Sequence, residues 1–117
     1  MEKKKIMVVE DEKPIRELMA DLFLSRDIGV DSYPDGAAVL ETINADNPPD
    51  LVITDFRMPR IDGAELSTVI RDTWPEMTII MISATPSEIP ENHKADVILI
   101  KPFRIKILTG IVSGLLS

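Results

Sequence analysis

Five side chains that suit metal or phosphate chemistry follow apolar segments of this 117-residue sequence. They are Glu10, Asp11, Asp55, Ser83 and Lys101. Two like charges about 4 Å apart repel by about 4 kcal/mol at an effective dielectric constant of 20, and a few such contacts rival the net stability of a domain. If the three carboxylates meet, a positive charge must therefore lie among them. An all-oxygen ligand set favours Mg²⁺ where phosphate is also handled, and Lys101 supplies a second positive charge.

Asp55 is the side chain best placed to react. A carboxylate beside Mg²⁺ can attack phosphorus and form an aspartyl phosphate. Lys101 would then neutralise the phosphoryl oxygens, and the Ser83 hydroxyl would donate a hydrogen bond to one of them. Each of these residues alone is more often a solvated loop residue or a helix cap. Their joint placement after four different strands favours a site, with Glu10 and Asp11 holding the metal.

The elements that must position these side chains alternate regularly between strand and helix. Short apolar runs predict four buried strands, at residues 6–9, 51–54, 78–82 and 97–100, and alternating apolar and polar residues predict a half-exposed edge strand at residues 30–33. This alternation predicts a parallel sheet between two helical layers, with right-handed crossovers. We expect a flavodoxin-like, doubly wound α/β fold with strand order 2-1-3-4-5, in which the functional crevice lies at the carboxyl ends of the strands.

Five helices are expected between and after the strands. Pro86 and Pro90 leave room for only a short or irregular fourth helix, around residues 87–94. Asp35 is a plausible cap of the second helix. Helical spacing predicts buried stripes at Ile15, Leu18, Met19, Leu22 and Phe23, at Ala38, Val39 and Ile43, at Leu66, Val69 and Ile70, and at Ile105, Leu108, Ile111, Val112, Leu115 and Leu116.

Length and composition set the remaining bounds. A chain of 117 residues is expected to form one domain, residues 1–117. Its net charge of −7 argues against binding nucleic acid, and no apolar run approaches the roughly 20 residues that span a membrane. The chain contains no cysteine, which is compatible with the cytoplasm, and its lysine-rich start is followed by too few apolar residues for an export signal.

With these motifs in order, the sequence resembles the receiver domain of two-component response regulators over nearly its whole length. The resemblance rests on Val8-Val9-Glu10-Asp11-Glu12, Asp55-x-x-Met58-Pro59-x-x-Asp62-Gly63, Ser83-Ala84 and Lys101-Pro102-Phe103. It implies that Asp55 accepts a phosphoryl group from a histidine of a sensor histidine kinase or of a histidine phosphotransfer protein. It also implies that Asp11, Asp55 and the backbone carbonyl of Arg57 contact Mg²⁺, with Glu10 assisting.

The resemblance implies a cytoplasmic, phosphorylation-dependent switch and not a turnover enzyme, although slow autodephosphorylation is expected. The switch would act on a C-terminal output domain that is missing from this chain, or on a partner. A pseudo-receiver, which binds a partner without phosphorylation, is the alternative. A metal-dependent phosphohydrolase is a weaker one, because Arg57 stands where a general acid would be needed.

Two features depart from the family's pattern. Ile98 lies three residues before Lys101, where the family typically has an aromatic residue that turns inward on activation. The stretch from Ser83 to Lys101 is about one helical turn shorter than usual. We therefore expect a truncated fourth helix and an unusual output face.

Four further residues carry smaller expectations. Arg57 and Thr85 occupy positions that, in the family, help to set the lifetime of the phosphoryl group; Arg57 either hinders the attacking water or faces solvent. Phe103 is expected to pack the last helix against the sheet. His93 is expected to be an exposed loop residue and not a phosphate carrier.

Overall fold

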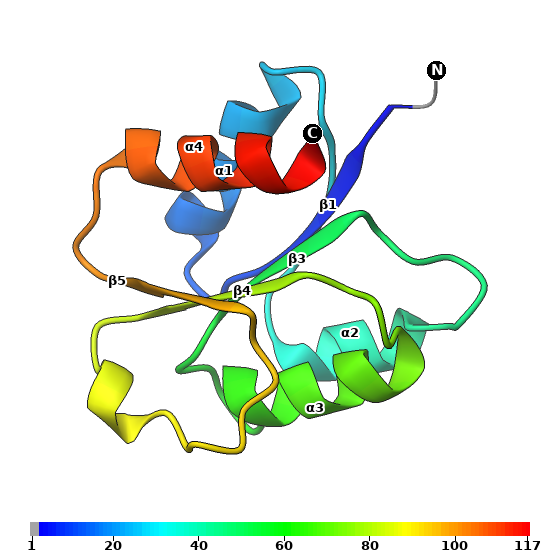
Figure 1. Ribbon diagram of the computed structural model, residues 1–117, viewed down its shortest axis with the longest axis vertical. Coiled ribbons are helices and arrows are strands. Elements are labelled where there is room, and N and C mark those ends of the chain that lie inside the picture. The colour runs from blue at the N-terminus through cyan, green and yellow to red at the C-terminus, as the bar shows by residue number, and fades with distance from the viewer. Residues whose placement is uncertain (1–2) are drawn as a thin grey trace.

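The computed structural model describes residues 3–117 and contains one parallel five-stranded sheet with helices on both faces (Figure 1). The predicted strand order is confirmed as β2-β1-β3-β4-β5. The strands are β1 (Lys5–Val9), β2 (Gly29–Tyr33), β3 (Leu51–Asp55), β4 (Ile79–Ser83) and β5 (Val97–Ile100). Residues 1–2, at the start of the predicted domain, lie outside the described part.

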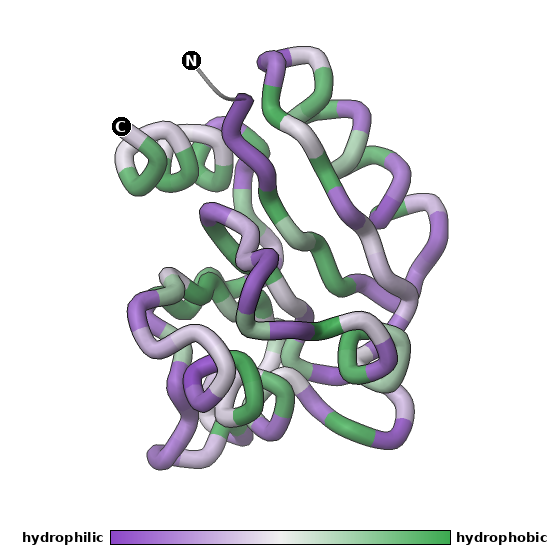
Figure 2. Tube along the Cα trace, turned by 90° about the vertical axis from the view of Figure 1, so that its right-hand side faces the viewer, coloured by the Kyte–Doolittle hydropathy of each residue, from purple (hydrophilic) through white to green (hydrophobic). Residues whose placement is uncertain are grey.

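Two helices cover each face of the sheet (Figure 1). On one face lie α1 (Lys13–Leu24) and α4 (Ile105–Leu116), which bury Met19, Phe23, Leu108 and Val112 against the strands. On the other face lie α2 (Gly36–Thr42) and α3 (Gly63–Thr73), which bury Val39, Leu66 and Ile70. Figure 2 shows the chain coloured by hydropathy, with green hydrophobic stretches between purple and white hydrophilic ones.

The register of the strands brings four carboxyl ends to one edge of the sheet. Val9 pairs with Thr54, Asp55 pairs with Ile82, and Ser83 pairs with Ile100. Because parallel strands end together, residues that directly follow β1, β3, β4 and β5 meet at that edge. The fold therefore gathers the predicted site residues from distant parts of the sequence.

The prediction of five helices needs a correction. Residues 3–117 form four α-helices, and in place of the expected fourth helix stands a single 3₁₀ turn, η1 (Pro86–Glu88). Pro86 opens the turn and Pro90 follows it, so the chain lacks the backbone N–H groups that a longer helix would use. The expected truncation is confirmed.

Three residues of the predicted helical stripes are exposed. Leu18 is 60% exposed, Ile105 43% and Leu115 42%; Ile105 is the first residue of α4 and Leu115 the last but one. Phe103 packs against the core as predicted. His93 was expected to be exposed, but it is half-buried, and its Nδ1 accepts a hydrogen bond from the Ala95 N–H at 3.1 Å.

Capping explains where two helices begin. The Asp35 side chain accepts a hydrogen bond from the Ala38 N–H, which confirms the predicted cap. At α3, the Asp62 side chain accepts from the Glu65 N–H and the Glu65 side chain accepts from the Asp62 N–H, forming a capping box. The Asp-Gly pair after β3 is thus the start of a helix as well as the end of a loop.

The side chain of Arg71 joins the loop between α3 and β4 to the irregular stretch before β5. Its guanidinium donates to the carbonyls of Pro75, Met77 and Lys94 and pairs with Asp96 at 2.9 Å. The Asp96 carboxylate also accepts from the Ile79 N–H at 2.8 Å. One cation at the end of α3 thus satisfies carbonyls that no helix pairs.

Replacement of Arg71 by methionine is expected to lower the free energy of unfolding by about 2 kcal/mol. Methionine keeps an apolar stem but leaves these carbonyls and Asp96 without their donor. Urea denaturation of Arg71→Met, with the exposed Arg26→Met as a control for charge, measures the loss. Equal denaturation midpoints for the two variants would show that these contacts of Arg71 contribute nothing to stability.

Candidate functional site

Three carboxylates meet at the carboxyl edge of the sheet. Glu10, Asp11 and Asp55 each offer an oxygen, and these oxygens lie within 4.8 Å of one another. Glu10 and Asp55 are buried, whereas Asp11 is exposed. The cluster is therefore open to solvent on one side and enclosed by protein on the other.

Glu10 is held at the tip of β1 by backbone contacts. Its N–H donates to the Tyr33 carbonyl at 3.0 Å, and its carbonyl accepts from Arg16 Nη1 at 2.7 Å. Its side-chain oxygen accepts from the Glu12 N–H at 3.2 Å. The sequence reasoning missed Arg16, because no local spacing rule links a helix residue to the carbonyl of the strand before it.

Asp55 is the last residue of β3 and is paired with a cation. Lys101 Nζ lies 3.0 Å from Asp55 Oδ1, and this lysine side chain is 34% exposed. The Lys101 N–H donates to the Ser83 carbonyl at 2.8 Å, which ties the start of the β5–α4 loop to the end of β4. The predicted lysine thus stands against the predicted nucleophile.

Crowding shifts the pKa values of two of these groups. Burial, together with hydrogen bonding to Asp55, raises the pKa of Glu10 from 4.5 to about 8. Burial alone would lower the pKa of Lys101, but the hydrogen bond and the charge of Asp55 raise it overall. In the metal-free protein Glu10 therefore keeps its proton near neutral pH, which relieves part of the repulsion among the three carboxyl groups.

The raised pKa of Glu10 predicts that the metal-free protein loses stability as pH rises from about 5 to about 8. In this window folded Glu10 holds a proton that the unfolded chain has released, so each rise in pH favours unfolding. We expect a loss on the order of 3 kcal/mol relative to Glu10→Gln, which cannot titrate. Urea denaturation in EDTA at several pH values measures it. Parallel pH profiles for the two proteins would contradict the shift.

Ser83 lies at the end of β4, beside the strand that carries Asp55. Its hydroxyl oxygen accepts from the Thr85 N–H at 2.9 Å and lies 3.4 Å from Thr85 Oγ1. The oxygen of the hydroxyl is thus held by its own turn as an acceptor, which leaves its hydrogen able to donate to another group.

Arg57 follows Asp55 by two residues and has an exposed side chain. Its guanidinium forms an ion pair with Glu88 in η1. The sequence reasoning missed Glu88, because the partner lies in the turn that replaces the expected helix. The Arg57 side chain in this structure therefore faces solvent and contacts Glu88.

The loop after Asp55 is held closely against α3 by Gly63. A Cβ at this position would lie 2.3 Å from the Asp55 carbonyl oxygen and 2.9 Å from Phe56 Cα. The Gly63 N–H donates to the Phe56 carbonyl at 2.7 Å. The glycine therefore permits a close backbone approach that fixes the position of Asp55.

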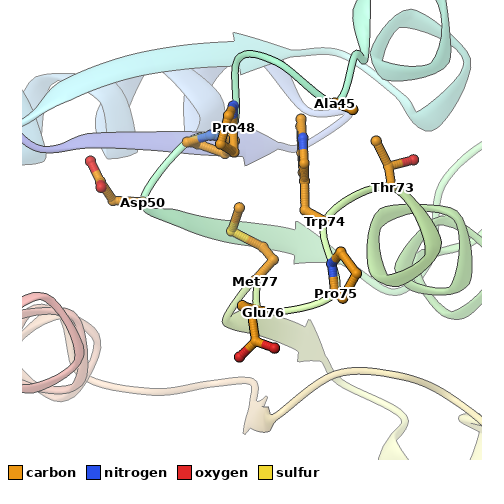
Figure 3. Close-up of a pocket in the computed structure, with 9 residues that line it drawn as sticks. Ala45, Pro48, Asp50, Thr73, Trp74, Pro75, Glu76 and Met77 are labelled. Atoms are coloured by element: carbon orange, nitrogen blue, oxygen red, sulfur yellow. The ribbon is translucent and has the colours of Figure 1, made fainter.

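A hollow of about 400 Å³ lies at the opposite edge of the sheet, before β3 and β4. Figure 3 shows the side chains around it, among them Pro48, Trp74 and Met77. It shares no residue with the acidic cluster. The hollow is therefore separate from the cluster at the carboxyl edge.

The chemistry of the donor set fits a hard divalent cation. The clustered ligand atoms are oxygens of three carboxyl groups, the kind of ligand that hard cations prefer, and Lys101 pairs with only one of these groups, that of Asp55. Glu10, Asp11 and Asp55 would hold the ion. The fourth predicted ligand, the Arg57 carbonyl, lies in the adjoining loop after β3.

Known proteins and protein families are similar to this chain over most of its length. Residues 6–113 match the response regulator receiver domain family. Response regulator MprA of Mycobacterium sp. (strain KMS) is 32% identical over 116 residues, which cover 96% of this chain and 50% of that protein. The chain thus spans about half the length of the curated relatives it matches.

Two solved structures are similar in both sequence and fold. Response regulator protein TrrA of Thermotoga maritima, in complex with Mg²⁺-BeF, is 31% identical with a TM-score of 0.83; the match covers 96% of this chain and 98% of that one. TrrA in complex with histidine kinase ThkA is 32% identical with a TM-score of 0.84 and coverage of 97% and 99%. Chemotaxis response regulator CheY4 of Vibrio cholerae, at 21% identity and a TM-score of 0.84, shares the fold.

Proposed function

Because this chain belongs to the response regulator receiver domain family, we propose that phosphorylation of Asp55 switches it between two signalling states. The predicted domain, residues 1–117, would act as one receiver unit. The observation that carries the proposal is the site itself: a buried carboxylate at a strand end, beside Lys101 at 3.0 Å and two further acids.

The proposed donor is a phosphohistidine of a sensor histidine kinase or of a histidine phosphotransfer protein. An Asp55 carboxylate oxygen attacks the phosphorus, the P–N bond breaks, and the imidazole nitrogen leaves with the electron pair. One P–O bond replaces one P–N bond, so no oxidant or further reactant is required. The structure of ThkA with TrrA, a pair of histidine kinase and response regulator, supports this class of donor.

The chain's own residues supply orientation and charge. Lys101 holds Asp55 from one side and would neutralise a phosphoryl oxygen. The Ser83 hydroxyl, whose oxygen accepts from the Thr85 N–H, would donate its hydrogen to another phosphoryl oxygen. Glu10, Asp11, Asp55 and the Arg57 carbonyl would hold Mg²⁺, which supplies positive charge for the transferred group when bound. The TrrA complex with Mg²⁺-BeF supports this choice of ion.

The switch would be read by an output domain or by a separate partner, and the domain itself would not act as a turnover enzyme. The greater length of the curated relatives supports an output partner. Family membership supports a cytoplasmic location, and within residues 3–117 no helix has the length and hydropathy needed to cross a bilayer. The net charge of −7 disfavours direct binding to nucleic acid.

Acetyl phosphate and a histidine kinase are suitable donors for the test. Intact mass spectrometry should show the addition of one phosphoryl group in Mg²⁺ and far less in EDTA. No adduct from either donor would favour the pseudo-receiver alternative. Release of phosphate at high turnover would instead favour the hydrolase.

A further inference from the structure

The Arg57–Glu88 ion pair joins the two loops that border the proposed acceptor site. Arg57 lies in the loop after β3, two residues beyond Asp55, and Glu88 ends η1, the turn that follows Ser83. The two side chains are 66% and 48% exposed. The pair therefore bridges the segment that carries the acceptor and the segment that replaces the expected fourth helix.

The turn that Glu88 belongs to is weakly held. Within η1 the Glu88 N–H donates to the Thr85 carbonyl at 2.9 Å, and the Ile89 N–H donates to the Pro86 carbonyl at 3.2 Å. Ile89, which directly follows the turn, is buried in a cluster with Phe56 and Met81 and so anchors the end of the turn. A short 3₁₀ turn contributes little stability of its own, so a side-chain contact can change how often it opens.

Phosphorylation would place a competitor beside Arg57. An aspartyl phosphate carries more negative charge than a carboxylate and presents several acceptor oxygens. The planar guanidinium binds such oxygens in pairs, so phosphate recognition suits arginine well. With Arg57 two residues from Asp55 on an exposed, flexible stem, the phosphoryl group and Glu88 would compete for one cation.

We propose that the Arg57–Glu88 ion pair is a latch that holds η1 to the acceptor loop and is released when Asp55 is phosphorylated. The latch rests on the proposed function, since the competing group is the phosphoryl group on Asp55. Release changes the dynamics of residues 85–89, and it gives the chain a way to report phosphorylation through the turn that stands in place of a fourth helix. Glu88 is a positioning residue here and takes no part in the transfer.

Amide hydrogen exchange of Glu88 and Ile89, followed by NMR, tests the latch. An exposed ion pair shifts an equilibrium by a factor of about two to five, so exchange at these two amides should accelerate by about that factor on phosphorylation. In Glu88→Gln, unphosphorylated protein should already exchange at the faster rate and respond little to phosphate. Glu91→Gln, the same charge change at an exposed position nearby, should behave like the wild type.

Arg57→Gln provides a second variant that removes the other half of the pair. Both variants should show fast exchange without phosphate, and combining them should add nothing further. Intact mass is recorded first. If no adduct forms on the wild type, the proposed function fails and the latch with it. If the adduct forms but the two amides exchange as before, or if Glu88→Gln exchanges like the wild type, the latch alone is overturned.

Discussion

Asp55→Asn is expected to take up no phosphoryl group from acetyl phosphate or from a histidine kinase. The amide keeps the size of the side chain but offers no anionic oxygen to form an acyl phosphate, and it removes the partner of Lys101 at 3.0 Å. Intact mass spectrometry over a time course measures the uptake. Circular dichroism of the variant checks that the sheet remains folded.

Asp55→Glu separates charge from position. It keeps a carboxylate but moves it by about one carbon–carbon bond, and misplacement on this scale can slow a reaction by about 100-fold. We therefore expect slow phosphorylation for glutamate and none for asparagine. Wild-type uptake by Asp55→Asn, with both proteins folded, would mean that another side chain is the acceptor.

Gly63→Ala is expected to destabilise the protein by about 3 kcal/mol and to slow phosphorylation. The new methyl group would lie 2.3 Å from the Asp55 carbonyl oxygen and 2.9 Å from Phe56 Cα, and backbone atoms cannot move aside as a flexible side chain does. The loop that carries Asp55 must shift to relieve the contact. We therefore expect this one substitution to lower both the free energy of unfolding and the rate of phosphorylation.

Gly110→Ala is the matched control for that substitution. Gly110 lies inside α4, and a Cβ there would meet nothing within 4 Å. Alanine should stabilise the helix by about 0.5–1 kcal/mol, because glycine is the poorer helix former. Urea denaturation compares the two variants. A Gly63→Ala midpoint at or above that of the wild type would contradict the close approach.

The sequence predicted the strands and their order well, because buried parallel strands are short apolar runs and their alternation with helices restricts the topology. Val97–Ile100 was predicted to the residue, β1, β2 and β3 each extend one residue beyond the prediction at one end, and β4 is shifted by one residue at both ends. The gathering of Glu10, Asp11 and Asp55 followed from the same rule, since parallel strands end at one edge.

Contacts between irregular segments escaped prediction. The Arg71 guanidinium donates to carbonyls in the α3–β4 loop and in the irregular stretch before β5. Glu88 pairs with Arg57, which lies 31 positions earlier in the sequence. Such contacts depend on where a loop returns in space, which no local spacing encodes. The predicted burial of Leu18 was wrong for a related reason. Helical spacing predicts which side of a helix is apolar, but not how much of that side a neighbouring element covers.

Chemical trapping of the phosphorylated residue is the most direct test of Asp55 as the acceptor. Borohydride reduces an aspartyl phosphate to homoserine, and peptide mass spectrometry then locates the change. After incubation with Mg²⁺ and acetyl phosphate we predict homoserine at position 55, absent when donor or Mg²⁺ is omitted. The assignment of the acceptor would be contradicted if homoserine appeared at Asp11 or at any other aspartate while Asp55 remained unchanged.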